Sequence, residues 1–298
     1  MIRALPDHKP ASNDVVTPDP ALYLNHFGFT ELPFGITPDT GFAYSVQHHQ
    51  EALNTLLLAL NAGEGFVKIT GEVGTGKTLL CRRLLQTLDQ SWVSAYLPNP
   101  NLAPNTLFLA LAEELGIDDA GGLDQYHLIR RINHLLLAHA QMNKRVVVCI
   151  DEAQAMPLES LEALRLLSNL ETEKCKLLQI ALFGQPELDD KLHRPEVRQL
   201  LQRIAFHYRL GGLKNSEIGN YLAHRLRVAG YRGEGLFTLA AIRALYRASG
   251  GTPRLINILA HKSLLSVFGE GRQLVKVRHI RIARRDTEGA RRLGWFWG

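Results

Sequence analysis

The stretch Gly71-Glu72-Val73-Gly74-Thr75-Gly76-Lys77-Thr78 fits the pattern G-x-x-x-x-G-K-[ST] of a phosphate-binding loop. The apolar run 66–70 before it predicts a buried strand, and the leucine spacing over 79–88 predicts a helix after it. In that context the glycines let backbone N–H groups face phosphate oxygens at the positive end of a helix. The stretch therefore predicts binding of a nucleoside triphosphate. Lys77 is expected to reach the β- and γ-phosphates, and the Thr78 hydroxyl to bind Mg²⁺.

Further β-branched and apolar runs predict a sheet. Besides 66–70, we expect strands at 92–97, 145–150, 177–183 and 204–210, separated by helices at 47–60, 79–88, 106–115, 123–142 and 158–170. The run 145–150 is continuously apolar after Arg145, which is typical of a central parallel strand buried on both faces. Alternating strands and helices predict an α/β fold, whose ligands bind beyond the carboxyl ends of the strands.

Beyond residue 213 only helical patterns remain, at 216–229, 238–248, 253–268 and 277–291. We expect a boundary near Gly211-Gly212 and a small all-α domain after it. At the other end, the proline-rich residues 1–20 predict a flexible lead-in. The aromatic segment that follows, from Tyr23 to Asp39, is expected to pack on a domain surface as an ordered loop.

Composition narrows the class of protein. The chain of 298 residues is 46% hydrophobic, so it can bury a sizeable core. Cys81, Cys149 and Cys175 lie far apart in apolar stretches and predict buried free thiols in a reducing compartment. The chain lacks a signal peptide at its N-terminus and a run of about 18 apolar residues, so we expect a cytoplasmic protein. Residues 269–298 hold eight Lys/Arg against three acidic residues and thus carry the whole net charge of +5.

Two acidic residues close the predicted strand 145–150. A carboxylate at that end lies beside the phosphate-binding loop, so Asp151 is the candidate for holding Mg²⁺. Glu152 is the candidate base that orients or deprotonates the attacking water. The alternative for both is an ordinary acidic helix start.

Three further side chains are candidates for the reaction. Gln185 follows the strand 177–183 and is positioned to sense the γ-phosphate, although a simple turn residue before Pro186 is the alternative. Arg203 is the candidate arginine finger toward a neighbouring subunit, with Arg198 in reserve; a solvated helix face is the alternative. Arg254 opens a helix with Thr252 as its N-cap. A cation there opposes the helix dipole, and a nucleotide phosphate would compensate it.

His48 and His49 beside Glu51 invite a metal interpretation. Adjacent residues of a helix point to different faces, which favours ordinary solvated or capping roles for the two histidines. The sequence therefore supports no metal site there.

Taken together, these motifs resemble the AAA+ ATPases of the GspA/ExeA secretion family. The resemblance runs from about Tyr23 to Val277. It is carried by the pieces Tyr23–Phe29 with Pro33-Phe34 and Thr37–Asp39, Gly71–Thr78, Asp151–Gln154, Gly184–Leu188, Gln202–Ile204, and Gly251–Arg254 with Asn257. It implies a five-stranded AAA+ core with a four-helix lid, and ATP hydrolysis with Mg²⁺ in a ring-like homo-oligomer. It also places the second phosphate-sensing arginine on Arg254 and the finger on Arg203. Gln185 departs from the Asn or Thr usual in AAA+ sensors.

The resemblance suggests the following domains: a lead-in over 1–20, an ATPase core over 21–212, a lid over 213–271 and a basic, aromatic tail over 272–298. Family members continue into a membrane span and a periplasmic peptidoglycan-binding region. This chain ends at Gly298, which favours the shorter, pilus-type members. The expected role is to drive assembly of a type IV (MSHA-type) pilus or a general secretion machine, with inner-membrane components as partners.

Other functions share parts of this pattern. A TniB-like, DNA-associated regulator of transposition or replication has the same core. The basic tail shows no recognisable helix-turn-helix, however, and the core is charge-neutral, so nucleic acid is not the expected partner. Asp151–Gln154 imitates the box of DEAD-like helicases, which need a second core that this chain lacks. The tail could dock to an anionic membrane surface; a solvated helix with a sticky end is the alternative.

Overall fold

The computed structural model describes residues 20–291 except 38, 43, 45, 46, 119 and 172–175. Residues 1–19 of the predicted lead-in 1–20, Cys175 and the tail residues 292–298 lie outside the described residues. Within them, five strands form one parallel sheet in the order β2-β3-β4-β1-β5. The strands are β1 (Phe66–Thr70), β2 (Trp92–Leu97), β3 (Arg145–Ile150), β4 (Gln179–Gly184) and β5 (Ile204–Arg209). The predicted α/β fold is confirmed.

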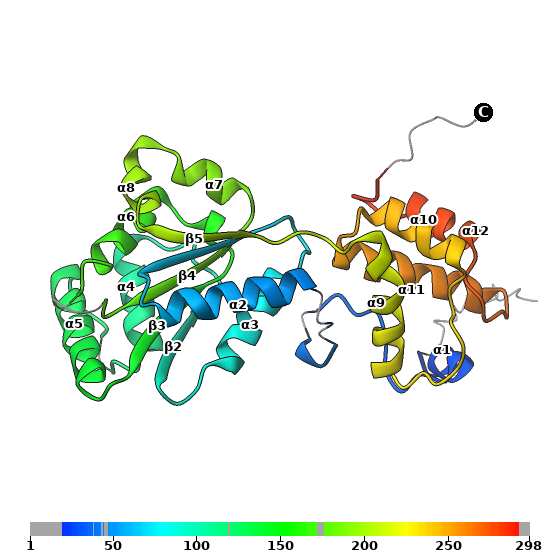
Figure 1. Cartoon of the computed structure of the whole chain (residues 1–298), viewed down its shortest axis with the longest axis horizontal. Helices are drawn as coiled ribbons and strands as arrows, with labels where there is room; N and C mark the ends of the chain where they lie inside the picture. The colour runs from blue at the N-terminus through cyan, green and yellow to red at the C-terminus, as the bar shows by residue number, and fades with distance from the viewer. Residues whose placement is uncertain are drawn as a thin grey trace, which may run out of the picture.

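Helices cover both faces of the sheet (Figure 1). One face packs on α2 (Gln47–Asn61) and α3 (Lys77–Thr87). The other packs on α4 (Pro104–Glu114), α5 (Gln125–Gln141) and α6 (Leu158–Leu167). Alternate residues of β3 supply the two cores: Val147 and Cys149 face α2 and α3, whereas Val146, Val148 and Ile150 face the other layer. This two-sided burial explains the continuous apolar run of the strand.

Shorter elements connect these layers. The 3₁₀ turns η1 (Thr40–Phe42), η2 (Ala153–Ala155) and η3 (Pro195–Val197) and the helices α7 (Glu187–Leu192) and α8 (Arg198–Leu201) were not predicted individually. Helix α6 is shorter than predicted and ends at Leu167. Cys81 and Cys149 are free and buried, as expected.

A helical lid follows the sheet. It contains α9 (Asn215–Val228), α10 (Leu239–Ser249), α11 (Pro253–Gly269) and α12 (Val277–Arg285) around a second core (Figure 1). Helix α12 ends at Arg285, six residues earlier than predicted. Its buried residues Ile280 and Ala283 belong to the lid core, so the residues that the sequence analysis gave to a tail begin inside the lid.

The aromatic segment near the N-terminus corrects one prediction. We expected a loop, but residues Pro20–Phe27 form helix α1. Tyr23 and Phe27 are 4% exposed and pack in the lid core with Phe29 and Phe34. The ring centroids of Tyr23 and Phe268 lie 5.8 Å apart, which joins α1 to the end of α11. The segment precedes the sheet in sequence but contributes its aromatic rings to the lid.

Candidate active site

The phosphate-binding loop connects β1 to α3, and its glycines are required by geometry. Gly74 and Gly76 have φ values of 79° and 97°, a left-handed conformation that disfavours other residues. A Cβ atom on Gly74 would lie 2.5 Å from Cβ of Arg254, and one on Gly76 would lie 2.8 Å from Nε2 of His49. Helix α3 begins after Gly76 without a side-chain cap. Its first N–H groups are therefore available to an anion.

Lys77 lies over this loop. Its Nζ donates to the carbonyl oxygens of Gly71, at 2.8 Å, and Glu72, at 3.1 Å. Burial lowers the pKa of the Lys77 amine, although the carboxylates of Glu152 and Asp151 oppose this shift. The carbonyl oxygens of the loop thus hold the Lys77 ammonium group in place.

Asp151 follows β3 and is 3% exposed. The Thr78 hydroxyl hydrogen-bonds to its carboxylate, and the Glu152 N–H donates to Oδ1 at 3.0 Å. Burial raises the pKa of Asp151, while these two hydrogen bonds act in the opposite direction. A carboxylate and a hydroxyl side by side are the oxygen donors that Mg²⁺ prefers. Thr78 and Asp151 therefore fit the ion that the family implies.

Glu152 is held by two amide side chains. Its Oε2 accepts from Nε2 of Gln154 at 2.6 Å and from Nε2 of Gln185 at 3.1 Å. The backbone N–H of Gln185 in turn donates to Oε1 of Gln154 at 2.9 Å. Glu152 has φ 51°, a left-handed conformation that costs a non-glycine residue about 1–2 kcal/mol. Gln185 was expected to face the γ-phosphate and here contacts the candidate base Glu152. Gln154, which contacts the same carboxylate, had no predicted role.

A cleft of about 310 Å³ separates this edge of the sheet from the lid. Lys77, Thr78, Glu152 and Gln185 line it from the core, and Arg254 lines it from the first turn of α11. The Arg254 N–H donates to the Gly74 carbonyl at 3.3 Å. Thr252 occupies the N-cap position of α11 as predicted, but its side chain makes no capping hydrogen bond.

Three lid side chains and the segment after α1 complete the wall of the cleft. Tyr221 donates to Oδ1 of Asn257 at 2.8 Å, and Nδ2 of Asn257 donates to the Gly35 carbonyl at 3.0 Å. Arg225 donates through Nε to the Pro33 carbonyl at 2.6 Å. Sequence reasoning missed Tyr221 and Arg225. Tyr221 and Arg225 are four residues apart on α9, a spacing that indicates a shared face of the helix but no contact with a ligand.

Comparisons with known proteins agree with this geometry. A model of the AAA domain family matches residues 60–192. General secretion pathway protein A of Aeromonas hydrophila is 42% identical over 273 residues. That alignment covers 91% of this chain and 49% of the relative. Over most of its length the chain is thus similar to an AAA+ protein of the GspA/ExeA type. It spans about half the length of the curated relative that it matches.

Solved structures share the AAA+ fold of this chain at low identity. The ORC2 protein of Aeropyrum pernix is 16% identical with a TM-score of 0.62, covering 86% of this chain and 73% of that one. Cdc6p of Pyrobaculum aerophilum is 18% identical with a TM-score of 0.63, covering 83% and 70%. The RuvB Holliday junction branch migration motor of Thermotoga maritima is 16% identical with a TM-score of 0.53, covering 81% and 69%. At these identities the likeness concerns the fold alone.

His49 corrects another expectation of the sequence analysis. It is 8% exposed rather than solvated, and its Nε2 lies 2.9 Å from the Thr75 carbonyl oxygen. Because a carbonyl only accepts, Nε2 must carry the proton. His48 instead lies 3.6 Å from the Glu51 carboxylate. No cluster of His, Cys, Asp and Glu suited to a metal ion occurs among the described residues.

The finger candidates lie apart from this cleft. Arg203 precedes β5, and its Nη1 donates to the Ser168 hydroxyl and, at 3.3 Å, to the Arg165 carbonyl of its own chain. Arg198 begins α8 and is exposed. Since all five strands are parallel, the start of β5 is at the opposite edge of the sheet from the phosphate-binding loop.

In the part of the chain that the structure describes, no helix is long and apolar enough to span a bilayer.

Proposed function

We propose that this chain binds and hydrolyses ATP with Mg²⁺ in the cleft between the core and the lid. The observation that carries the proposal is that Lys77, Thr78, Asp151 and Glu152 meet at one edge of the sheet, opposite Arg254. A phosphate-binding loop alone could serve binding; a carboxylate base beside it supports hydrolysis.

Each residue has a distinct part in the proposed reaction. Lys77 and the loop N–H groups bind the phosphate oxygens, and Thr78 and Asp151 hold the Mg²⁺ ion. When bound, Mg²⁺ neutralises charge on the phosphates. Glu152 accepts the proton of the attacking water, with the amides of Gln154 and Gln185 fixing one of its two oxygens. Arg254 contacts the phosphates from the lid, so that nucleotide draws the lid toward the core.

Turnover measurements test hydrolysis. Glu152→Gln removes the base and leaves the phosphate contacts, so ATP turnover should fall by about 10²–10⁴-fold while ATP binding stays within a few-fold of wild type. Steady-state phosphate release and equilibrium binding of a labelled nucleotide measure the two effects. Glu159→Gln, on the exposed part of α6, is the matched control and should behave as wild type. Normal turnover by Glu152→Gln would show that another group is the base.

We further propose that turnover drives assembly of a type IV (MSHA-type) pilus or a related secretion machine at the cytoplasmic side of the inner membrane. The similarity to general secretion pathway protein A supports this step. Replacing the chromosomal gene by the Glu152→Gln form should abolish surface pili or secretion as completely as a deletion does. Normal pili and normal secretion in that strain would contradict the assignment.

The same proposal includes a ring-like homo-oligomer in which Arg203 reaches the nucleotide of a neighbouring subunit. Its place at the edge of the sheet opposite its own loop suits action on a second chain. Arg203→Ala alone should hydrolyse ATP poorly, and mixing it with Glu152→Gln should restore part of the activity, because mixed interfaces pair an intact base with an intact arginine. No recovery at any mixing ratio would contradict a role across subunits, and recovery with Arg198→Ala instead would move the finger to that residue.

A further inference from the structure

Helices α10 and α12 enclose a basic groove of about 290 Å³ in the lid, which we call the lid groove. Arg243 and Arg247 line it from α10, and Arg281 and Arg284 line it from α12. Its remaining lining is apolar and comes from Val277, Ile280 and three alanines of α10. None of the residues that line the groove also lines the nucleotide cleft. The proposed ATPase reaction leaves the lid groove unused.

Among the residues that the structure describes, the arginines of the lid groove have no partners of opposite charge. No ion pair or hydrogen bond joins any of the four guanidinium groups to another described residue. Nη1 of Arg284 is buried and still lacks an acceptor. Arg243 and Arg247 are four residues apart on one face of α10, a spacing at which like charges destabilise a helix. The fold thus keeps four cations together where they oppose its own stability.

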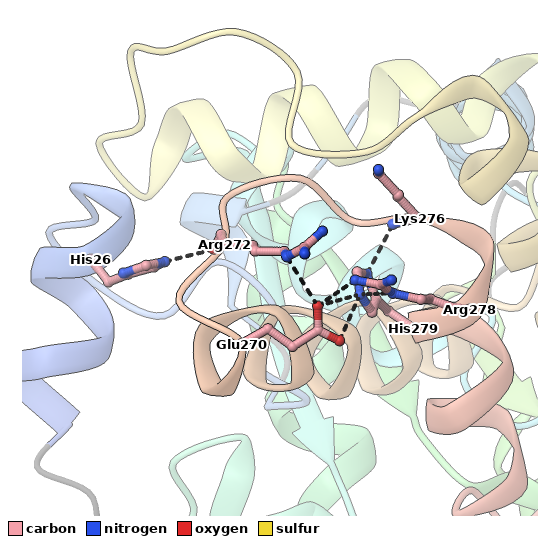
Figure 2. Close-up of polar contacts among 6 residues, drawn as sticks. All are labelled: His26, Glu270, Arg272, Lys276, Arg278 and His279. Atoms are coloured by element: carbon pink, nitrogen blue, oxygen red, sulfur yellow. Dashed lines mark hydrogen bonds and ion pairs between the residues drawn. The ribbon is translucent and has the colours of Figure 1, made fainter.

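Other basic residues of the same region are paired, as Figure 2 shows. Nη2 of Arg278, one turn from Arg281 on α12, lies 2.5 Å from Oε2 of Glu270, and Arg272 Nε lies 3.7 Å from the same oxygen. Nε2 of the buried His279 lies 3.3 Å from the other oxygen, Oε1. The Glu270 carboxylate at the end of α11 therefore pairs with Arg272, Arg278 and His279. None of the residues that line the lid groove is acidic.

We propose that the lid groove binds an acidic peptide segment of a partner protein. Guanidinium groups form forked hydrogen bonds with carboxylates, so the four arginines suit Asp or Glu side chains. The apolar floor would contact aliphatic side chains between those carboxylates, as helical or extended segments do in protein grooves. A nucleic acid backbone offers nothing apolar to this floor, and a bilayer surface is too flat to enter a groove. Charge complementarity and shape together favour the peptide.

A peptide-binding measurement tests the proposal without nucleotide, so its outcome is independent of ATP hydrolysis. The probe is a short fluorescein-labelled peptide of Glu and Leu, compared with the same peptide carrying Gln for Glu. We expect the full chain to bind the Glu peptide, and Arg243→Gln/Arg281→Gln to bind it about tenfold more weakly. Arg130→Gln/Arg194→Gln removes the same charge from exposed core positions and should stay within about twofold of wild type. Fluorescence anisotropy at low and physiological salt gives the affinities.

Several results would overturn the proposal. The first is that the wild type fails to bind the Glu peptide, and the second is that it binds the Gln peptide equally well. The third such result is that the two double variants bind the Glu peptide equally weakly. Tighter binding of a DNA duplex or of phosphatidylserine vesicles, lost in Arg243→Gln/Arg281→Gln, would assign the groove to nucleic acid or membrane instead. As a check on folding, Arg243→Glu/Arg281→Glu should bind a Lys/Leu peptide, which a misfolded lid would not do.

Discussion

At the scale of single residues, His49 connects α2 to the phosphate-binding loop. Its Nε2–H group donates to the Thr75 carbonyl, and its ring occupies the space that a side chain at Gly76 would need. Nδ1 is buried, with no hydrogen-bond partner among the described residues. Burial lowers the pKa of His49, although the hydrogen bond to Thr75 acts against this shift. The loop is therefore held by a neutral imidazole.

This arrangement predicts how stability depends on pH. A histidine whose pKa is lower in the folded state binds its proton more readily when unfolded. The stabilising contribution of neutral His49 is complete above the unfolded pKa of about 6.5 and is lost as the pH falls below it. One such group changes the free energy of unfolding by at most about 1.4 kcal/mol per pH unit. Chemical denaturation between neutral and mildly acidic pH should show this loss in the wild type.

His49→Gln is the informative variant, because Gln can also donate to the Thr75 carbonyl but does not titrate. Burial also lowers the pKa of His207 and His261, so only the difference between wild type and variant isolates His49. We expect the variant to lose less stability on acidification. Parallel pH profiles for the two proteins would show that His49 does not titrate in this way.

How far the sequence predicts the site depends on how local each contact is. The loop residues and Asp151-Glu152 stand next to strands with strong apolar patterns, so the pattern itself positions them. His49 precedes its loop partner Thr75 by 26 residues, and Gln154 contacts Gln185 across 31 residues. No local pattern encodes such contacts. In the sequence, Gln154 was recognised only as part of the Asp151–Gln154 motif, without a role of its own.

At the scale of elements, strand prediction succeeded because β1, β3 and β4 are buried almost throughout and β5 alternates between half-buried and exposed residues. The predicted bounds of β1, β2 and β3 match the structure, while β4 starts two residues later than predicted and β5 ends one residue earlier. Helix α1 was missed because the segment that contains it is aromatic and turn-rich, and because partners such as Phe268 lie in the lid, far along the chain. Long-range burial decides its conformation.

The aromatic contacts of α1 predict a stability effect. Phe27 is 4% exposed, stacks on Phe29 at 5.2 Å and meets Tyr23 edge-on at 5.4 Å. Phe27→Ala should lower the free energy of unfolding of the lid by about 3–5 kcal/mol, because it removes buried surface and leaves a cavity. Thermal or urea unfolding measures the loss. Leu22→Ala, at a position 58% exposed on the same helix, is the control and should change little; equal effects would show that α1 does not pack as described.

At the scale of the whole molecule, the sheet with its covering helices and the helical lid, which have separate hydrophobic cores, meet at the nucleotide cleft. The sheet contributes the loop and the acidic pair, and the lid contributes Arg254, with the Gly212–Leu213 connection between them. Leu213 donates to the Gly251 carbonyl at 2.8 Å, and a Cβ atom on Gly251 would lie 2.2 Å from the Leu213 oxygen. The start of the lid is thus packed directly on the turn that presents Arg254. In the proposed reaction, this turn would carry a change at the phosphates to the lid.

The central claim is that a nucleotide binds in this cleft through Lys77. Calorimetric titration of the wild type with a non-hydrolysable ATP analogue and Mg²⁺ tests it most directly. We predict one saturable site per chain and at least about a hundredfold weaker binding by Lys77→Ala, whereas Lys144→Ala, an exposed lysine of the core, should bind as the wild type does. A wild type that binds no nucleotide, or a Lys77→Ala variant with unchanged affinity, would contradict the account.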